Sequence, residues 1–327
     1  MTQGATAAGA SAPVLSVQGL TVSVHGKPLV EGLSFDLARG ETLAIAGESG
    51  SGKSITSLAV MGLLPPQVGA TAGRILLEGR DLLTLPEAAM RPLRGGRIAM
   101  IFQEPMTSLN PVMTVGAQLV EAIVAHEPLP RAAARARALA ALQSVRIAQP
   151  ERRLTQYPHE LSGGMRQRVM IAMALALRPD VLICDEPTTA LDVTMEAQII
   201  HLLRELRQDH HGAIVIVTHH LGVVGELCDR VYVMYAGEVV EEGTTDEIHH
   251  TPRHPYTQAL IDCDPAHIAG RMERLPTIPG RLPDLAAPPP GCAFAARCPQ
   301  AGPDCATPPP RVRLGPSHAA LCHRVRP

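Results

Sequence analysis

Short runs of apolar residues recur along the chain and predict buried β-strands. They lie at 42–47 (TLAIAG), 97–102 (RIAMIF), 181–185 (VLICD) and 213–218 (AIVIVT). Strands that are apolar at successive positions are typical of a parallel sheet covered on both faces. Two other stretches, 73–82 and 231–243, alternate apolar and polar residues, and the second contains Ala236-Gly237 as its predicted hairpin turn. These two stretches predict an added antiparallel β layer.

The pattern becomes helical between residues 105 and 161, where Arg131–Val145 is rich in strong helix formers. We interpret about 105–161 as an inserted α-helical subdomain of a main domain that spans 14–250. Residues 1–13 have neither the basic nor the apolar region of a signal peptide, so they predict a disordered N-terminus.

The last part of the chain, 251–327, differs in composition because it holds 16 of the 30 prolines. Proline lacks a backbone N–H and fixes φ, so we expect this C-terminal extension to form neither a helical nor a sheet core. A disordered tail is one interpretation of it. The extension also holds four of the seven cysteines: Cys292, Cys298, Cys305 and Cys322.

Composition argues against several classes of protein. Lys plus Arg (29) nearly balances Asp plus Glu (31), and only 2% of residues are aromatic, so neither a basic field nor base-stacking rings for nucleic acid are expected. With 46% hydrophobic residues the chain can bury a large core. No apolar run approaches the roughly 18 residues of a spanning helix. A protein that stays in the cytosol is therefore predicted.

Residues 47–54 (GESGSGKS) fit the P-loop pattern and lie between a predicted strand and a predicted helix. The residues of this loop are Gly47, Glu48, Ser49, Gly50, Ser51, Gly52, Lys53 and Ser54. Glycines let backbone N–H groups curl around phosphate oxygens, Lys53 is expected to reach the β- and γ-phosphates, and the Ser54 hydroxyl to coordinate Mg²⁺.

A second strand supplies carboxylates, because VLIC leads into Asp185 and Glu186. Asp185 is expected to hold Mg²⁺, and Glu186 to polarise the attacking water. The spacing along the chain favours adjacent positions of this strand and the P-loop strand. The predicted fold class is α/β: a P-loop NTPase (RecA-like) parallel sheet core with an antiparallel β layer, an inserted α-helical subdomain and a Pro/Cys-rich C-terminal extension.

Residues 161–168 (LSGGMRQR) precede a helical run and resemble the signature motif of ABC ATPases. Ser162, Gly163 and Gly164 at a helix start form a second anion-binding nest. Other elements of that family follow in its order. Gln103 resembles the Q-loop glutamine, Ala190-Leu191-Asp192 the D-loop, and His219 the switch histidine.

The resemblance implies ATP and Mg²⁺ as cofactors and a second ABC ATPase subunit, identical or homologous, as partner. In this family the signature motif of one chain faces the P-loop of the other, so one cassette does not complete a site. ATP binding and hydrolysis would then close and reopen the pair and drive membrane subunits.

Three further stretches resemble the dipeptide, oligopeptide and nickel importer branch: 102–111 (FQEPMTSLNP), 157–160 (YPHE) and 254–260 (HPYTQAL). The resemblance implies import of short peptides, two permease subunits, an extracytoplasmic solute-binding protein, and a peripheral place on the cytoplasmic face of the inner membrane. Nickel or another small solute is the alternative. Two positions depart from the pattern of this branch. Adenine usually stacks on an aromatic residue, and here His25 is the only planar candidate. His220 follows the switch histidine at a position where Asp is usual.

The sequence supports two other functions less well. A soluble ABC ATPase acting on nucleic acid or ribosomes is disfavoured, because such proteins usually carry two cassettes or a long coiled-coil insertion. A non-catalytic cassette is disfavoured because Glu186 and the signature are both intact.

The four C-terminal cysteines predict a [4Fe-4S] cluster. Five, six and sixteen residues separate them, whereas zinc sites usually show pairs two to four apart. The framing GCAFAARCP, 291–299, also resembles the cysteine tail of peptide-importer ATPases. Two alternatives stay open: four free thiols, and a structural zinc site to which His318 and His323 contribute.

Overall fold

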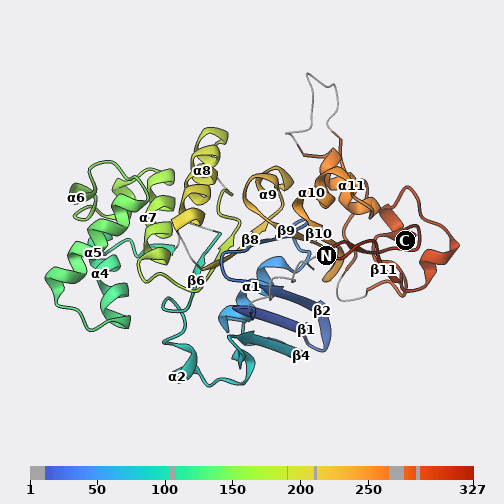
Figure 1. The fold of residues 1–327 in the computed structure, drawn as a ribbon, viewed down its shortest axis with the longest axis horizontal. Coiled ribbons are helices and arrows are strands. Elements are labelled where there is room, and N and C mark those ends of the chain that lie inside the picture. The colour runs from blue at the N-terminus through green and yellow to red at the C-terminus, as the bar shows by residue number, and fades with distance from the viewer. Residues whose placement is uncertain (1–11, 104–107, 190, 210–211, 265–275, 285–287) are drawn as a thin grey trace, which may run out of the picture.

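The centre of the molecule is an eight-stranded sheet with the strand order β11-β12-β10-β9-β3-β8-β7-β6 (Figure 1). The computed structural model describes residues 12–103, 108–189, 191–209, 212–264, 276–284 and 288–327. The strands of the sheet are β3 Thr42–Ala46, β6 Ile98–Ile101, β7 Val181–Asp185, β8 Ala213–Thr218, β9 Arg230–Tyr235, β10 Glu238–Thr244, β11 Arg311–Arg313 and β12 Ala319–Leu321.

The predicted apolar runs form the parallel part of this sheet. Strand β3 pairs in parallel with β8 and β9, and β7 pairs in parallel with β8 and β6. Every residue of β3, β7 and β8 is buried, which explains why these strands are apolar throughout. The predicted adjacency of β3 and β7 is wrong, because β8 lies between them.

A second, four-stranded antiparallel sheet has the order β2-β1-β4-β5. Its strands are β1 Leu15–Val24, β2 Lys27–Leu37, β4 Val68–Leu77 and β5 Arg80–Asp81. The antiparallel layer predicted from 73–82 is thus confirmed. Residues 231–243 do form the predicted hairpin, β9–β10, but β9 pairs with β3, so the hairpin belongs to the main sheet.

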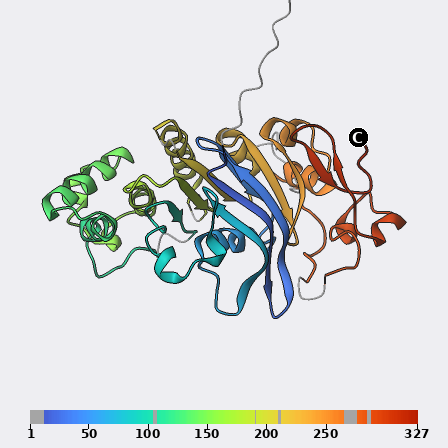
Figure 2. The same ribbon diagram turned by 60° about the horizontal axis from the view of Figure 1, so that its bottom comes forward.

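The helical subdomain lies at one end of the main sheet, where α4, α5, α6 and α7 gather (Figures 1 and 2). The remaining helices border the two sheets and the C-terminal extension. The α-helices are α1 Lys53–Met61, α2 Glu87–Met90, α4 Val115–His126, α5 Arg131–Ser144, α6 Pro150–Arg153, α7 Gly163–Leu175, α8 Val193–Asp209, α9 Leu221–Leu227, α10 Thr245–His250 and α11 Pro255–Asp262.

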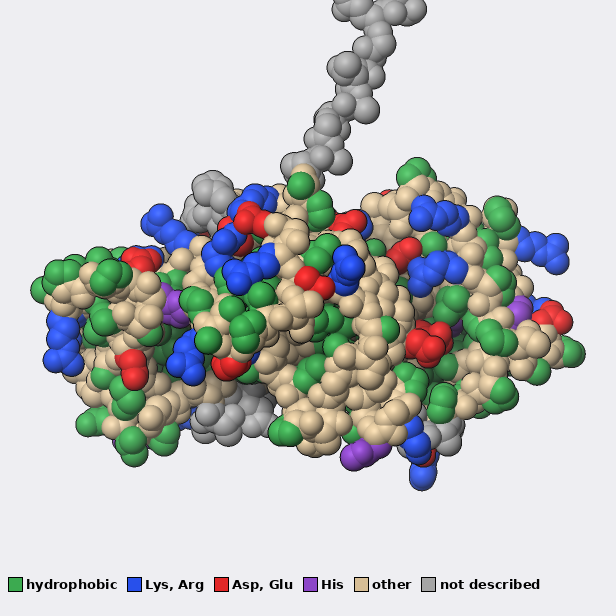
Figure 3. Space-filling model, turned by 90° about the horizontal axis from the view of Figure 1, so that it is seen from below, with side chains coloured by type: hydrophobic (Ala, Val, Ile, Leu, Met, Phe, Trp, Pro, Cys, Tyr) green, Lys and Arg blue, Asp and Glu red, His purple; other side chains and the backbone are tan. Residues whose placement is uncertain are grey.

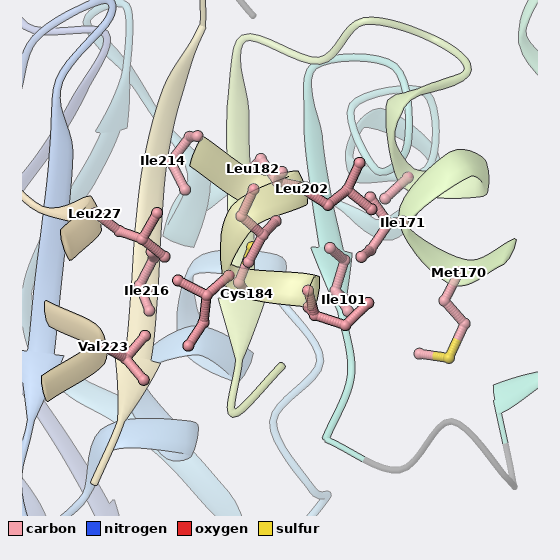
Figure 4. Packing of buried hydrophobic residues seen from close by; sticks show 14 of the residues in the cluster. Ile101, Met170, Ile171, Leu182, Cys184, Leu202, Ile214, Ile216, Val223 and Leu227 are labelled. Carbon is pink, nitrogen blue, oxygen red and sulfur yellow. The ribbon is translucent and has the colours of Figure 1, made fainter. Parts of the chain in front are cut away.

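The main core fills the space between the sheet and the helices α7, α8 and α9. Figure 4 shows Cys184 of β7 among Ile101, Leu182 and Ile216, and its side chain is fully buried. Burial raises the pKa of this thiol to about 12. Cys184 therefore acts as a small apolar core residue, as its position in an apolar strand predicts.

The C-terminal extension contributes a helix and a strand of the main sheet, so the expectation that it forms neither a helical nor a sheet core is wrong. It begins with α11, and β12 pairs antiparallel with β10 and so extends the main sheet. Short 3-10 turns at Ala295–Arg297 and Pro303–Ala306 connect the rest. Prolines lie between these elements and at the first turn of α11, where a missing N–H costs little.

The surface in Figure 3 shows Lys and Arg interspersed with Asp and Glu, without one continuous basic area on that face. Within the described ranges, none of the helices has both the length and the apolar character that crossing a bilayer requires.

Candidate nucleotide site

The P-loop connects β3 to α1 and is shaped by close backbone contacts. Gly47 has φ 147°, and a Cβ there would lie 2.2 Å from the carbonyl oxygen of Met234. Gly52 has φ 102° and would place a Cβ 2.9 Å from the carbonyl oxygen of Leu29. Only glycine satisfies both conditions, so the loop can bring its N–H groups to the helix N-terminus.

Lys53 is buried inside this loop, at 4% exposure. Its Nζ donates to the carbonyl oxygens of Gly47, at 2.7 Å, and Glu48, at 2.9 Å. Burial lowers its pKa, against the opposing pull of nearby carboxylates. The Oγ of Ser51 is fully buried without a hydrogen-bond partner among the described residues. A buried cation and a buried orphan hydroxyl fit a bound phosphate group.

A cavity of about 220 Å³ lies over the loop. Its lining includes Ser49, Gly50, Lys53, Ser54, Gln103 and Glu186. At its edge the Ser54 hydroxyl donates to Oδ1 of Asp185 at 3.0 Å, which brings the two predicted Mg²⁺ ligands together. Burial raises the pKa of Asp185 to about 6. A divalent cation would compensate this lost solvation, so the pair fits Mg²⁺.

Glu186 follows β7 with a left-handed backbone, φ 46°, and is 7% exposed. Its Oε2 accepts from Nε2 of Gln103 at 2.7 Å and from the hydroxyl of Thr189 at 2.9 Å. Nδ1 of His219 lies 3.3 Å from its Oε1. Contact with His219 is the main cause that lowers the pKa of Glu186 to about 2, with Thr189 adding to it. Two side chains therefore donate hydrogen bonds to this carboxylate, and His219 lies beside it.

His219 ends β8 as predicted, and His220 packs beside it with ring centroids 4.1 Å apart. The structure thus brings Gln103 and His219 to Glu186 from the ends of three different strands, with Asp185 directly before Glu186. Of these residues, Gln103 and Glu186 line the cavity. Strained backbone at a carboxylate of this kind is typical of functional sites.

The signature residues lie elsewhere. Ser162 caps α7, where its Oγ accepts from Met165 N at 3.4 Å, and Ser162 and Gly163 are exposed while Gly164 is buried. Gln167 of the same helix donates to the carbonyl oxygen of Pro187 at 2.7 Å, which ties α7 to the segment after Glu186. None of 161–168 lines the cavity over the P-loop.

Other predicted residues are placed as follows. Asp192 is exposed and accepts from Met195 N at 2.9 Å, so it caps the start of α8. Ala190 lies outside the described residues, as do 104–107 of the stretch 102–111. His25 is exposed in the turn between β1 and β2.

The four C-terminal thiols are neighbours without forming a ligand set. Burial raises the pKa of Cys292, and the nearby thiols of Cys305, Cys322 and Cys298 raise it further. The described part of the chain nevertheless contains no group of three or more His, Cys, Asp or Glu side chains placed to hold a metal ion. The thiols as they stand therefore do not fit an iron–sulfur cluster.

The two histidines of the zinc alternative have other partners. Nε2 of His318 lies 2.8 Å from Oε1 of the buried Glu241, and Nε2 of His323 lies 3.1 Å from the carbonyl oxygen of Thr307.

Sequence reasoning missed three residues at this site. Thr189 holds Glu186, and the sequence offered only its closeness to Asp185-Glu186 as a signal. Arg297 and Tyr256 contact Glu48 from the C-terminal extension. Arg297 lies within the stretch GCAFAARCP, in which only the cysteines indicated a function, and Tyr256 lies within HPYTQAL.

Comparison with known proteins gives a consistent result. The family profile described as ABC transporter matches residues 30–189, and that of the oligopeptide/dipeptide transporter C-terminal region matches 240–305. The chain is 51% identical to the probable peptide ABC transporter ATP-binding protein y4tR of Sinorhizobium fredii, over 95% of each chain. It is 53% identical to the dipeptide transport ATP-binding protein DppD of Bacillus subtilis, over 88% of this chain and 87% of that protein.

Solved structures are also similar. The ATP-binding cassette MJ0796, a dimer bound to ADP and Pi, superposes with a TM-score of 0.63 at 26% identity, over 71% of this chain and 98% of that one. The structure of cbiO1 from Clostridium perfringens, part of the ABC transporter complex cbiONQ, gives 0.63 at 31% identity, over 73% and 91%.

Proposed function

The chain belongs to the ATP-binding proteins of ABC transporters, in the peptide-transport branch, and we propose that it powers import of short peptides through partner permeases. As a member of this family it is an ATP hydrolase. The names of its relatives, peptide and dipeptide transport ATP-binding proteins, support the choice of solute class. Nickel or another small solute remains the alternative within the branch.

One observation carries the catalytic part of the proposal. Glu186 lines the cavity over the P-loop, and its carboxylate accepts hydrogen bonds from Gln103 and Thr189, with His219 beside it. A carboxylate fixed in this way can accept a hydrogen bond from a water and orient it toward a phosphate held by the loop.

The other residues take roles around this centre. Lys53 and the N–H groups of the P-loop hold the phosphates, and Ser54, Asp185 and Gln103 hold Mg²⁺, which when bound neutralises phosphate charge. His219 lies beside Glu186 and is the residue that would contact the terminal phosphate. Lys53 exchanges its two carbonyl contacts for phosphate oxygens when ATP binds.

The signature residues Ser162, Gly163 and Gly164 face the P-loop of a second ATPase subunit, and Asp192 belongs to the loop that crosses the subunit interface. The exposure of Ser162 and Gly163, away from this chain's own cavity, supports that role. Two membrane permeases and an extracytoplasmic solute-binding protein complete the proposed assembly, in which this chain lies on the cytoplasmic face of the membrane.

Reconstitution tests the proposed function. The chain, its cognate permeases, the second ATPase subunit and the binding protein are placed in proteoliposomes, and uptake of labelled di- and oligopeptides is measured with ATP. We expect ATP-dependent peptide uptake that Lys53→Ala abolishes, because the variant loses the charge that faces the phosphates. Uptake of nickel without peptide uptake would favour the alternative, and copurification with nucleic acid or ribosomes instead of permeases would refute transport.

We also propose that Cys292, Cys298, Cys305 and Cys322 ligate a [4Fe-4S] cluster, which requires the thiols to draw closer than they lie here. Support comes from the spacing of the four cysteines and from the resemblance of 291–299 to the cysteine tail of peptide-importer ATPases. Zinc and free thiols are the alternatives.

Anaerobic purification distinguishes these cases. A cluster predicts a brown protein with absorbance at about 400 nm and about four irons per chain. Each of the four cysteine substitutions should bleach it, whereas substitution of Cys184, Cys228 or Cys263 should not. A colourless preparation with one zinc or no metal would end this part of the proposal.

A further inference from the structure

The P-loop is contacted from the far end of the chain. Arg297, in the 3-10 turn of the C-terminal extension, makes a two-pronged ion pair with Glu48, the second residue of the loop. Its Nη1 lies 2.6 Å from Oε2 and its Nη2 2.9 Å from Oε1 of that carboxylate. The two residues are 249 positions apart in sequence. Such a paired contact fixes direction as well as distance.

Arg297 is itself held firmly. It is 7% exposed, its Nε donates to the carbonyl oxygen of Pro279 at 2.8 Å, and Nη2 also reaches the carbonyl oxygen of Ile278 at 3.3 Å. The guanidinium also donates to the hydroxyl of Tyr235 at 3.3 Å, and its Cζ lies 5.7 Å from the centroid of that ring. A planar group with this many partners has little freedom, so it transmits its position to Glu48.

Two further contacts from the same extension reach the loop. The backbone N–H of Glu48 donates to the hydroxyl of Tyr256 in α11 at 2.8 Å, and Tyr256 is fully buried. Leu282 lies against Gly50, with its Cδ1 3.7 Å from the position of a Cβ there. Residues after 250 thus contact the side chain of Glu48, its backbone N–H and Gly50 of the same loop.

Glu48 is also linked to the phosphate-binding lysine, because its carbonyl oxygen accepts from Nζ of Lys53. A carboxylate beside a site for a triphosphate repels the ligand unless a cation neutralises it. Arg297 faces that carboxylate at hydrogen-bond distance, and its own charge balances it.

We propose that Arg297 is a positioning residue of the nucleotide site, which holds Glu48 in place and cancels its charge so that the P-loop binds the ATP phosphates. The proposal rests on the proposed function, since it concerns how the same site binds ATP. It assigns to the C-terminal extension a part in ATP affinity that is exerted through Glu48. Arg297 does not touch the cavity over the P-loop, so it acts through Glu48 and not on the reacting atoms.

The test measures Mg·ATP binding by calorimetry and steady-state hydrolysis on the full-length chain. For Arg297→Gln we expect the Kd and KM for ATP to rise about tenfold, because Glu48 is then unneutralised, with kcat within about twofold of wild type. Arg297→Lys keeps the charge without the two-pronged geometry, so its Kd and KM for ATP should lie between those of wild type and Arg297→Gln.

Second-site rescue separates this role from a purely structural one. Glu48→Gln removes the repulsive charge, so the double variant Arg297→Gln/Glu48→Gln should bind ATP more tightly than Arg297→Gln alone. A folding defect would instead lower kcat as well as raise KM, and Glu48→Gln would not restore ATP binding. Arg324→Gln is the matched control, since Arg324 pairs with Asp304 at 3.6 Å within the same extension and does not reach the loop.

Each outcome decides the proposal. It is overturned if Arg297→Gln binds ATP like wild type, or if the losses from Glu48→Gln and Arg297→Gln simply add. If Arg297→Gln does not fold, Arg297→Lys and the double variant carry the same comparison. Failure of wild-type chain to bind or hydrolyse ATP would refute the proposed function itself, whereas normal wild-type activity with unaffected variants refutes only the role of Arg297.

Discussion

Glu186 has a left-handed backbone, and its carboxylate accepts from Gln103 and Thr189 and lies beside His219. Glu186→Gln keeps the size of the side chain and removes its negative charge. We expect hydrolysis to fall by about 10²- to 10⁴-fold while ATP affinity changes little, because a water is no longer polarised. Phosphate release and calorimetry measure the two quantities, and hydrolysis at wild-type rates would contradict the role.

His254 is a second residue whose chemistry is set by its surroundings. It is 1% exposed, and its ring Nδ1 accepts from the backbone N–H of Tyr256 at 3.0 Å at the start of α11. The backbone N–H of His254 donates to the carboxylate of Glu241. Burial lowers the pKa of His254 to about 4. The unfolded chain, with a pKa near the ordinary value of about 6.5, therefore binds a proton that the folded chain does not bind between these pH values.

The sign of the effect follows. The contribution of His254 to stability is complete above about pH 6.5 and is lost as the pH falls toward 4, by roughly 3 kcal/mol. His254→Asn keeps an acceptor at the helix start and does not titrate, so it should flatten this part of the pH profile of denaturant unfolding. The exposed His250, changed to Asn, is the control. An unchanged slope in His254→Asn would show that other groups cause the acid sensitivity.

At this scale the sequence predicts the motif residues and not their supports. Lys53, Asp185 and Glu186 follow from local patterns, because the P-loop and the strand before the carboxylates are contiguous. The contact between Arg297 and Glu48 spans 249 positions and has no motif of its own, so only the folded chain reveals it. The cysteines near Arg297 were visible, but their arrangement in space was not.

Among the elements, apolar runs predict the buried strands β3, β6, β7 and β8 well, because a strand covered on both faces must be apolar. Their order in the sheet is not encoded in such runs, which is why β8 was not expected between β3 and β7. Strand β12 was missed for another reason. It is three residues long and flanked by a proline-rich stretch, and its pairing with β10 supplies the stability that its composition does not show.

Helix α4 offers a prediction at this scale. Gly116 lies in its first turn, its N–H donates to the carbonyl oxygen of Leu154 at 2.9 Å, and a Cβ there would lie 2.6 Å from that oxygen. Alanine favours a helix over glycine by about 1 kcal/mol, yet the clash with backbone should outweigh this gain. We expect Gly116→Ala to lower the free energy of unfolding by about 1–3 kcal/mol.

The control for this variant is Gly69→Ala in β4, where a Cβ would have no neighbour within 4 Å. Thermal and denaturant unfolding of both variants measure the difference. If Gly116→Ala is as stable as Gly69→Ala, then α4 does not pack against Leu154 as closely as the structure indicates.

For the molecule as a whole, the cavity over the P-loop and the start of α7 are separate places. The cavity over the P-loop has Lys53 and Glu186 in its lining and no residue of 161–168, while Ser162 and Gly163 are exposed at the start of α7. Val193, next to the D-loop segment, is 82% exposed as well. A site shared with a second subunit predicts such exposure of Ser162 and Gly163 at a helix start, away from the cavity.

The last prediction tests this arrangement with Ser162→Arg. The arginine would project from an exposed helix start, so we expect ATP binding to the P-loop of the same chain to stay within about twofold of wild type while dimer closure is blocked. Glu186→Gln serves as the parent because it keeps ATP unhydrolysed, and light scattering measures its ATP-dependent dimerisation, alone and with the second ATPase subunit. Ser144→Arg, on the exposed surface of α5, is the matched control for added bulk and charge and should dimerise like the parent. Dimerisation of the Ser162→Arg chain at the parent's ATP concentration would mean that the signature motif does not face a partner's nucleotide, and the two-chain site would have to be abandoned.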